Sequence, residues 1–276
     1  GLPKDKGNGV YSLERAAELE HVLGPIRNNL NEIGIPVEQS NPEYAEGQVE
    51  VNIRYDEALL AADRVIIFRN LVKQMAFKHG YKATFMAKPF FEQSGSGFHC
   101  HYSLWKGGKN IFAESGKLSQ TGKYFVGGLQ KRMAEAAICG SATVNGFRRR
   151  QPYTFCPVNN AWGIDNRTVG IRVIEGSDTS TRVEKRDAGA DCNPYLLIAT
   201  DIAAGLDGIK NKIDPGPNMD IDLFDDLSPE DEAKIPHVCS SLDEALKSLD
   251  EDREFLKAGG VFDDETIDAY IALKME

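Results

Sequence analysis

The sequence predicts a fold of the α+β class, in which long helical segments and short strands are interspersed along the chain. Residues 11–34 and 57–79 repeat apolar side chains at helical spacing; the first run ends at Gly34 and the second is followed by Gly80. Residues 47–54 alternate polar and apolar side chains, which is typical of a strand with one buried face. We therefore expect a helix, a strand and a second helix in this part of the chain.

The next predicted elements lie on both sides of a loop rich in glycine and serine. Residues 82–88 predict a strand that leads into this loop, and residues 98–104 predict a strand that follows it. A helix is expected over about 121–139, and two more strands near 168–175 and 181–186.

The last quarter of the chain predicts helices and one long loop. Residues 193–207 form an apolar, buried helix that ends at Gly208, and residues 215–232 form an acidic, proline-containing surface loop. Ser241 and Glu244 have the spacing of a capping box, and a final helix is expected over 263–275. Ser12 is the expected N-cap of the first helix. Without internal repeats or a low-complexity linker, the sequence predicts one domain.

Composition excludes several classes of protein. A hydrophobic fraction of 41% with 27% charged residues is typical of a soluble protein with a packed core. A net charge of −10 argues against a nucleic acid or an anionic membrane as partner. We see neither an apolar run of membrane-spanning length nor a signal peptide. The five cysteines lack paired spacing, so we expect reduced thiols and a cytoplasmic protein.

The most informative stretch is 88–103, where the Gly/Ser-rich loop runs directly into His99 and His101. Residues two apart on a strand point to the same face, so the two imidazoles share one space. Glycines in the loop let ligand atoms approach the backbone closely. This combination predicts a cleft that holds a metal ion together with a phosphate or carboxylate group.

Four side chains at or beside strands are candidate metal ligands: Glu43, Glu50, His99 and Glu184. Carboxylates with one imidazole suit hard divalent ions such as Mg²⁺ or Mn²⁺. Alternatively, Glu43 and Glu50 are solvated, because acidic residues are usually exposed, and His99 alone is compatible with zinc or with a structural role. The lack of a Cys/His cluster of zinc spacing weakens the zinc alternative.

Arginines gather around these segments in a protein that is acidic overall. They are Arg148, Arg149, Arg150, Arg167, Arg172, Arg182 and Arg186. Arg182 and Arg186 alternate with Glu184 on one strand face, which favours bidentate anion binding. A salt-bridge network is the alternative interpretation, and it is more reasonable for Arg148 and Arg150. The Walker and GxGxxG phosphate-binding loops are both missing from the sequence.

The reaction that uses metal ligands and arginines together is phosphoryl transfer to a carboxylate, which requires no nucleophile from the protein. An acyl phosphate made in this way can then be attacked by an amine.

At this point the chain resembles the glutamine synthetase family closely. The matching segments are 43–50, 88–105, 166–172, 182–195 and 252–271. The resemblance covers nearly the whole chain, and several motifs in family order are more specific than any one of them. It implies a catalytic domain over 1–276, with a curved antiparallel sheet backed by helices.

The resemblance also implies roles for individual residues. Glu43 and Glu50 would hold one metal ion, and His99 with Glu184 would hold the second. The residues on the nucleotide side would be His101, Ser103, Trp105, Arg172 and Arg182. The contacts to glutamate or to the transferred phosphate would come from Gly95, Arg149, Arg167 and Arg186, of which the three arginines are implied to be catalytic. The implied cofactors are ATP and Mg²⁺ or Mn²⁺.

One departure from the family bears on the substrate. The family's flap glutamate, which closes the site and helps to bind and deprotonate ammonium, is replaced by Phe155 in the segment 147–157. A phenyl ring cannot accept a proton, and an apolar wall is better suited to an alkyl amine. Because of this expected contact with the amine, we also count Phe155 among the substrate-binding residues. This form of the flap is similar to that of the γ-glutamylmethylamide and γ-glutamylpolyamine synthetases.

Two further departures are smaller. The family's Asp-Asn-Gly-Ser-Gly loop appears here as residues 93–97 with Gln93 and Ser94, so the details of glutamate binding are expected to differ. Phe224 lies near the position where some bacterial members carry an adenylylated tyrosine, so we do not expect that control here.

The resemblance further implies parts that these residues do not contain. The family's N-terminal β-grasp domain is absent from the chain, and two more metal-binding glutamates belong to strands that precede it. We therefore expect the catalytic domain to be incomplete at both ends. The family's homo-oligomers are double-ring dodecamers with shared active sites, so this chain alone is expected to be inactive.

The sequence thus favours an ATP-dependent ligase that forms a γ-glutamyl amide through a γ-glutamyl phosphate. The alternatives are a glutamine synthetase that uses ammonium, a non-catalytic structural relative, and an unrelated α/β domain with solvated charges. Methylamine, other monoamines and polyamines all stay open as the amine. A polyamine needs a counter-charge, for which Asp165 and Asp187 are candidates.

Overall fold

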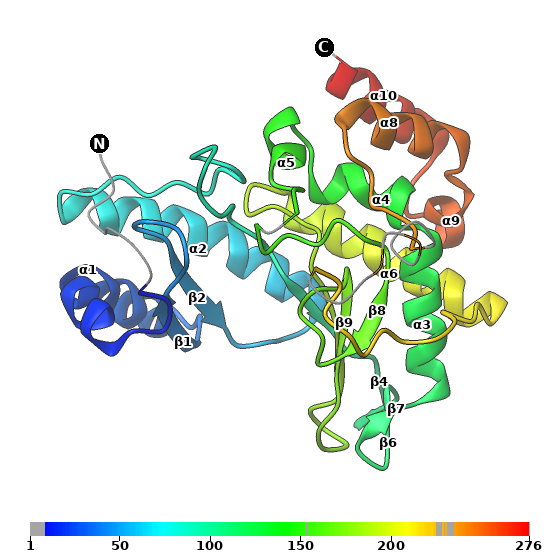
Figure 1. Ribbon diagram of the computed structural model, residues 1–276, viewed down its shortest axis with the longest axis horizontal. Helices are drawn as coiled ribbons and strands as arrows, with labels where there is room; N and C mark the ends of the chain where they lie inside the picture. The colour runs from blue at the N-terminus through cyan, green and yellow to red at the C-terminus, as the bar shows by residue number, and fades with distance from the viewer. Residues whose placement is uncertain (1–8, 153, 225–227, 229, 231–234, 276) are drawn as a thin grey trace. The chain divides into compact units, whose positions relative to one another are not determined.

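The structure is a computed structural model that describes residues 9–152, 154–224, 228, 230 and 235–275. The chain folds as two compact units, Gly1–Ser96 and Gly97–Glu276. The colours of Figure 1 follow the chain through the two units, from blue at the N-terminus to red at the C-terminus. No helix in the described part of the chain is long and apolar enough to cross a bilayer.

The first unit packs two long helices against a β-hairpin (Figure 1). Its elements are α1 (Leu13–Glu32), β1 (Val37–Pro42), β2 (Val49–Ile53) and α2 (Ala58–Lys78). The apolar stripe of α1, centred on Leu23 and Leu30, contacts Leu71 and Met75 of α2. The two predicted helices and the strand at 47–54 are thereby confirmed. The Ser12 hydroxyl accepts from the Arg15 amide at 3.4 Å, as expected of an N-cap.

The second unit contains a four-stranded sheet in the order β3–β10–β9–β8. The strands are β3 (Cys100–Tyr102), β8 (Trp162–Ile164), β9 (Ile171–Ile174) and β10 (Arg182–Lys185). Strand β10 is antiparallel to both β3 and β9, whereas β8 runs parallel to β9. The expectation of a purely antiparallel sheet is therefore wrong at this edge. The chain leaves β8 at Asp165, whose φ of 50° turns the backbone so that residues 165–170 return it to the start of β9.

Helices and short hairpins surround this sheet. The hairpin strands are β4 (Trp105–Lys106), β5 (Lys109–Asn110), β6 (Ala113–Glu114) and β7 (Lys117–Leu118). The helices are α3 (Gln120–Lys131), α4 (Met133–Gly140), α5 (Val144–Arg148), α6 (Pro194–Asn211), α8 (Leu242–Glu251), α9 (Glu254–Lys257), η1 (Ala258–Gly260) and α10 (Asp264–Met275). The main core joins Ile171 and Val183 of the sheet to Phe125 of α3 and Leu249 of α8.

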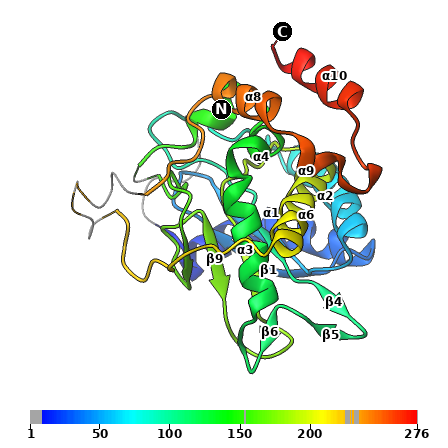
Figure 2. The same ribbon diagram turned by 90° about the vertical axis from the view of Figure 1, so that its right-hand side faces the viewer.

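Helices α3 and α6 lie side by side and touch through glycines (Figure 2). A Cβ atom on Gly128 would lie 2.1 Å from the Ala204 carbonyl oxygen, and one on Gly208 would lie 2.1 Å from the Tyr124 carbonyl oxygen. Such distances are impossible for real side chains, so glycine at both positions permits the close approach of the two backbones.

Several sequence-based expectations about this unit need correction. The predicted helix at 121–139 is two helices, because the chain bends at Arg132. The predicted end at Gly208 is wrong, since α6 continues to Asn211 and ends at Lys212 in the left-handed conformation. In the first unit, the predicted strand at 82–88 does not form among the described residues. An alternating pattern alone supplies no ladder partner.

Two expectations near the C-terminus fare better. The Ser241 hydroxyl caps α8 by accepting from the Glu244 amide at 3.2 Å. In turn, the Glu244 carboxylate accepts a hydrogen bond from the Ser240 amide, one residue before the N-cap. The final helix is confirmed as α10, whereas part of the predicted loop at 215–232 lies outside the described residues.

Candidate active site

Strand β10 places Arg182 and Glu184 on one face of the sheet, and Val183 with the buried Lys185 on the other. Val183 is fully buried in the core, whereas Glu184 is the direct cross-strand partner of His101 on β3 and of Arg172 on β9. Residues that are direct partners in an antiparallel pair have adjacent side chains on the same face. The register of three strands therefore brings a carboxylate, an imidazole and a guanidinium together.

Glu184 is the centre of this cluster, and its side chain is only 4% exposed. Its Oε1 atom lies 2.7 Å from Arg186 Nη1 and 3.3 Å from His99 Nδ1. Its Oε2 atom lies 3.3 Å from Arg172 Nη1. Burial alone would raise the pKa of Glu184, but its hydrogen bond with His99 and the positive charge of Arg186 outweigh burial and lower the pKa. The group is thus an anion at neutral pH.

The two histidines are neutral at the same pH. Burial lowers the pKa of His99 below its usual value and lowers the pKa of His101 to about 4. Arg182 Nε lies 3.2 Å from His101 Nδ1. Because a guanidinium can only donate, Nδ1 of His101 must accept, and we infer that its proton is on Nε2, 3.8 Å from Glu184 Oε1.

Cations outnumber anions around Glu184. Arg172 also pairs with Asp165 at 2.9 Å. Burial is the main cause that lowers the pKa of Arg186, and the charges of Arg172 and Arg167 lower it further. The predicted cluster of Arg167, Arg172, Arg182 and Arg186 is therefore a region of concentrated positive charge, which is suited to an anionic ligand.

Arg149 lies close to His99, since a Cβ atom on Gly97 would be 3.0 Å from both Arg149 Nη2 and His99 Nε2. The Arg149 side chain is among the most buried of the second unit. Its guanidinium donates to three consecutive carbonyl oxygens, those of residues 186, 187 and 188, at 3.1, 3.2 and 2.7 Å. It also donates to Cys156 Sγ at 2.7 Å. A substrate contact from Arg149 stays a prediction, and it would require the guanidinium to exchange one of these partners.

Phe155 follows α5 in the segment that corresponds to the predicted flap. Its side chain is half exposed, and its φ of 61° lies in the left-handed region. A bulky residue rarely adopts this backbone conformation, so surrounding contacts must hold it there. Such outliers are frequent at ligand sites, and this one coincides with the position that the sequence singles out.

Ser103 and Trp105 lie at the end of β3 and on β4. The Trp105 indole N–H donates to the Ser103 hydroxyl at 3.0 Å, and the ring is 45% exposed. An exposed indole next to a hydroxyl offers a flat surface and a polar group, as an adenine-binding wall requires.

The first unit carries the other predicted metal ligands. Glu43 follows β1 and Glu50 lies on β2, and their side chains share a hydrogen bond. Burial, followed by the hydrogen bond and charge of Glu50, raises the pKa of Glu43 to about 7. At pH 7, about half of the molecules therefore carry a proton on Glu43, in its hydrogen bond with Glu50. Gly95 is in the same unit, where its carbonyl oxygen accepts from Gln48 Nε2 at 3.0 Å.

The donor atoms match a divalent ion only in part. Among the residues that the structure describes, no group of three or more His, Cys, Asp or Glu side chains is placed to hold a metal. Glu43 with Glu50 provides two carboxylates, whereas Glu184 with His99 provides one carboxylate and one imidazole. Mg²⁺ is often held by one or two carboxylates while water and substrate phosphates complete its shell, so both pairs fit such an ion.

The sequence missed a buried charge network next to this cluster. Lys185 Nζ lies 2.7 Å from Asp201 Oδ1 and 3.3 Å from Asp187 Oδ1. Arg150 Nη2 lies 3.3 Å from Asp187 Oδ2, and Tyr102 donates to Asp201. The available signal was a lysine at an inward position of a strand and an aspartate inside an apolar helix. Both polyamine counter-charge candidates, Asp165 and Asp187, pair with cations of the chain itself.

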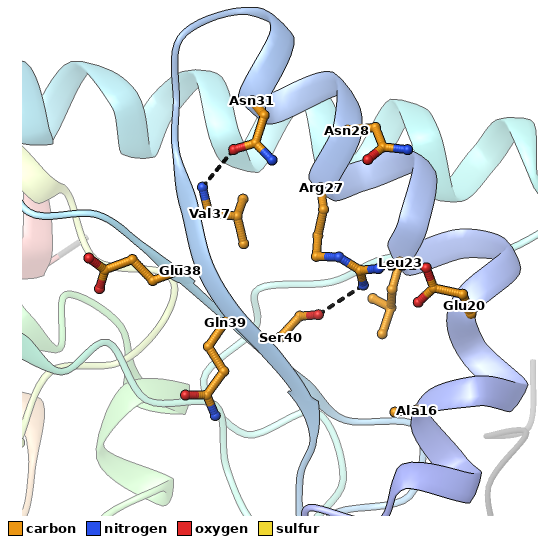
Figure 3. A pocket seen from close by; sticks show the side chains of 10 residues that line it. All are labelled: Ala16, Glu20, Leu23, Arg27, Asn28, Asn31, Val37, Glu38, Gln39 and Ser40. Carbon is orange, nitrogen blue, oxygen red and sulfur yellow. Dashed lines mark hydrogen bonds and ion pairs between the residues drawn. The ribbon is translucent and has the colours of Figure 1, made fainter.

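A groove in the first unit is separate from all of these residues. It encloses about 490 Å³ between α1 and β1, and Figure 3 shows Arg27, Asn31 and Ser40 among its lining side chains. Arg27 donates to the Ser40 hydroxyl at 3.0 Å and pairs with Glu20, and Asn31 accepts from the Val37 amide. None of the predicted site residues lines this groove.

Comparison with known proteins decides the family. The family model of the glutamine synthetase catalytic domain matches residues 2–276. This chain belongs to the glutamine synthetase family. The glutamine synthetase of Rhizobium meliloti (strain 1021) is 42% identical over 99% of the chain and 59% of its own length. That of Escherichia coli (strain K12) is 45% identical over 90% of the chain and 53% of its own length.

A solved structure of a γ-glutamylmethylamide synthetase, GmaS, in complex with ADP is also similar. It matches with a TM-score of 0.89 and 32% identity, over all of this chain and 64% of that one. The glutamine synthetase-type α+β fold is thereby confirmed. The chain of this glutamine synthetase-family protein spans a little over half the length of the curated relatives it matches.

Proposed function

We propose that the protein to which this chain belongs is a carbon–nitrogen ligase that uses ATP to join the γ-carboxylate of glutamate to a small alkyl amine. Membership of the glutamine synthetase family supports the reaction type. The positively charged cluster around Glu184 supports a phosphorylated substrate.

The proposed preference for an alkyl amine depends on Phe155. A flap carboxylate can stabilise ammonium and accept its proton, whereas a phenyl ring can do neither. The exposed ring of Phe155 offers an apolar contact for a methyl or ethyl group. The similarity to a γ-glutamylmethylamide synthetase structure supports the same choice.

A monoamine is favoured over a polyamine. A second ammonium group would need an anion to face it, and the two aspartates considered for this task already have partners. Asp187 is fully buried between Lys185 and Arg150, and Asp165 pairs with Arg172. Methylamine and ethylamine are therefore the first substrates to test.

The proposed reaction has two steps. An oxygen of the γ-carboxylate attacks the γ-phosphorus of ATP, the bond to ADP breaks, and γ-glutamyl phosphate forms. The amine nitrogen then attacks the acyl carbon, phosphate leaves, and the nitrogen loses a proton. Mg²⁺ or Mn²⁺ would neutralise phosphate charge when bound.

The chain's own residues would position these groups. We assign the holding of the ions to Glu43, Glu50, His99 and Glu184. Arg167 and Arg186 would contact the transferred phosphoryl group, and His101, Arg172 and Arg182 would face the nucleotide phosphates. Fixed guanidinium groups stabilise charge that develops on phosphoryl oxygens without having to reorganise.

A glutamine synthetase that uses ammonium is the second candidate. The glutamine synthetases of Rhizobium meliloti and Escherichia coli are 42% and 45% identical to the chain, a higher identity than the 32% of the GmaS structure. A non-catalytic relative is less well supported, since the charged residues to which we assign anion binding are all present.

The deciding experiment is ADP release by the full-length protein with Mg²⁺, glutamate and a panel of ammonium, methylamine, ethylamine and putrescine. Preference for methylamine or ethylamine would support the proposal. Preference for ammonium would establish the second candidate, and preference for putrescine would contradict the choice of a monoamine. Failure to bind Mg-ATP would favour the non-catalytic alternative.

We also propose that the full-length protein forms a double-ring homo-oligomer, as the family resemblance implies. Mass photometry of the full-length protein tests this, and a monomer at micromolar concentration would contradict it.

A further inference from the structure

Two consecutive arginines connect the start of the Phe155 segment with the end of strand β10. Arg149 and Arg150 directly follow helix α5 and come just before the residues that lead to Phe155. Arg149 donates both to Cys156, the neighbour of Phe155, and to the carbonyl oxygens of residues 186–188. One guanidinium therefore bonds to two segments of the chain that are about 30 residues apart in sequence.

Arg150 makes a second connection between the same two segments. Its guanidinium faces the carboxylate of Asp187 at 3.3 Å, and both side chains are at most 1% exposed. It also donates to the Cys239 carbonyl at 2.8 Å and to the Ser141 hydroxyl at 3.3 Å. At a site as buried as this one, a guanidinium with three such partners has little freedom to move.

Asp187 occupies the junction of these contacts. Its Oδ1 atom faces Lys185 Nζ and its Oδ2 atom faces Arg150 Nη2. Lys185 is balanced in turn by Asp201, which accepts from Tyr102. The buried network thus contains two cations and two carboxylates, and its charges balance. Removal of the Asp187 charge alone would leave Arg150 without its anionic partner.

Asp187 connects this network to the strand of the candidate active site. Asp187 follows Arg186 directly, and Glu184 lies three residues before it on β10. The segment that holds Asp187 is therefore continuous with the strand that carries the anion-binding cluster. On its other side, Asp187 meets the arginine that opens the Phe155 segment.

We propose that Asp187 is a positioning residue that fixes the Phe155 segment relative to Glu184 and Arg186 on β10, and thereby sets the amine site. The part of this role that concerns amine selection rests on the proposed function. The physical coupling between the Phe155 segment and β10 does not depend on which amine is used.

The test compares Asp187→Asn with Asp201→Asn in the full-length protein. Both substitutions remove one buried carboxylate charge from the same network, but only Asp187 contacts Arg150. Hydrogen exchange measured by mass spectrometry reports on peptides that contain Thr154 and Phe155. We expect Asp187→Asn to speed exchange in these peptides about tenfold or more, and Asp201→Asn to change it by less than about twofold.

Kinetics provide the second readout. With the amine that the wild type prefers, Asp187→Asn should raise the KM for the amine about fivefold while the Kd for ATP changes by less than about twofold. A purely structural role would alter both variants alike. Equal effects of the two variants, or wild-type exchange in Asp187→Asn, would overturn the proposal.

A double variant covers the case in which Asp187→Asn does not fold. Arg150→Met with Asp187→Asn removes one charge of each sign and leaves Lys185 paired with Asp201. If this folded variant kept wild-type exchange and amine KM, the positioning role would be excluded. Failure of the proposed function would appear instead in the wild-type amine panel, as a preference for ammonium or as no turnover, and the exchange comparison would still decide the role of Asp187.

Discussion

Arg172 Nη1 lies 3.3 Å from Glu184 Oε2 because the two residues are direct partners across strands β9 and β10. The pairing of β10 with β3 places His101 on the other side of Glu184. The fixed register of three short strands is therefore enough to surround the Glu184 carboxylate with cationic side chains. The consequences can be tested by substitution.

Phe155→Glu should move amine preference toward ammonium. A carboxylate at this position can accept a proton and stabilise a small cation, so we expect the ratio of kcat/KM for ammonium to that for methylamine to rise about tenfold or more. The measurement is ADP release by the full-length variant. Phe155→Leu is the matched control, since it keeps an apolar side chain and should retain the wild-type preference; an unchanged ratio in Phe155→Glu would contradict the assignment.

Arg132→Met should destabilise the second unit. The Arg132 guanidinium lies 3.0 Å from Asp207 and 2.5 Å from Asp252, and its side chain is 9% exposed. Its loss leaves partly buried carboxylates near one another, at a cost of about 2 kcal/mol after allowance for solvent. Thermal unfolding of the full-length protein should show a lower Tm. Lys247→Ala breaks an exposed pair with Glu251 and should leave the Tm nearly unchanged.

His101 should make the protein less stable as the pH falls. Its folded-state pKa of about 4 lies below the unfolded value of 6.5, so the unfolded chain binds more protons between these two values. This contribution is fully present above pH 6.5 and is lost as the pH falls toward 4. The Tm difference between wild type and His101→Gln should therefore shrink over this interval. A difference that is constant with pH would mean that the imidazole is not held neutral.

The effect of Glu43 on the pH dependence of stability is opposite to that of His101. Glu43 should also control metal binding. Its pKa of about 7 means that a proton must leave before both carboxylates can bind an ion. We expect Mn²⁺ affinity of the full-length protein to rise as the pH increases from about 6 to 8, by up to about tenfold per unit below pH 7. Titration calorimetry measures this. Glu50→Gln removes the neighbouring charge, so its residual Mn²⁺ binding should show a weaker pH dependence; an equal slope would contradict the shared proton.

Local patterns in the sequence predicted the parts of the structure that depend on near neighbours. The helices with apolar stripes, the caps at Ser12 and Ser241 and the strand around Glu184 all follow from spacing over a few residues. The shared face of His99 and His101, and that of Arg182, Glu184 and Arg186, could be anticipated because a strand alternates its side chains.

Contacts over long sequence separations could not be predicted in this way. Arg149 and Arg150 bond to residues 186–188 and to Cys239, which lie 37 or more residues further along the chain, and no local pattern predicts these contacts. The predicted strand at 82–88 was wrong for the same reason, since its alternation says nothing about a neighbour to pair with. Asp187 was a candidate counter-charge for a polyamine, yet it is fully buried and pairs with Lys185 and Arg150.

Strand β10 also bears on the accuracy of folding. It has only four residues, and short strands can pair in the wrong register. A slip by one position would place Lys185 among Arg172 and the histidines and would turn Glu184 toward Asp187 and Asp201. Like charges would then meet on both faces of the sheet. The alternation of charge along β10 therefore selects against misaligned pairing while the chain is still folding.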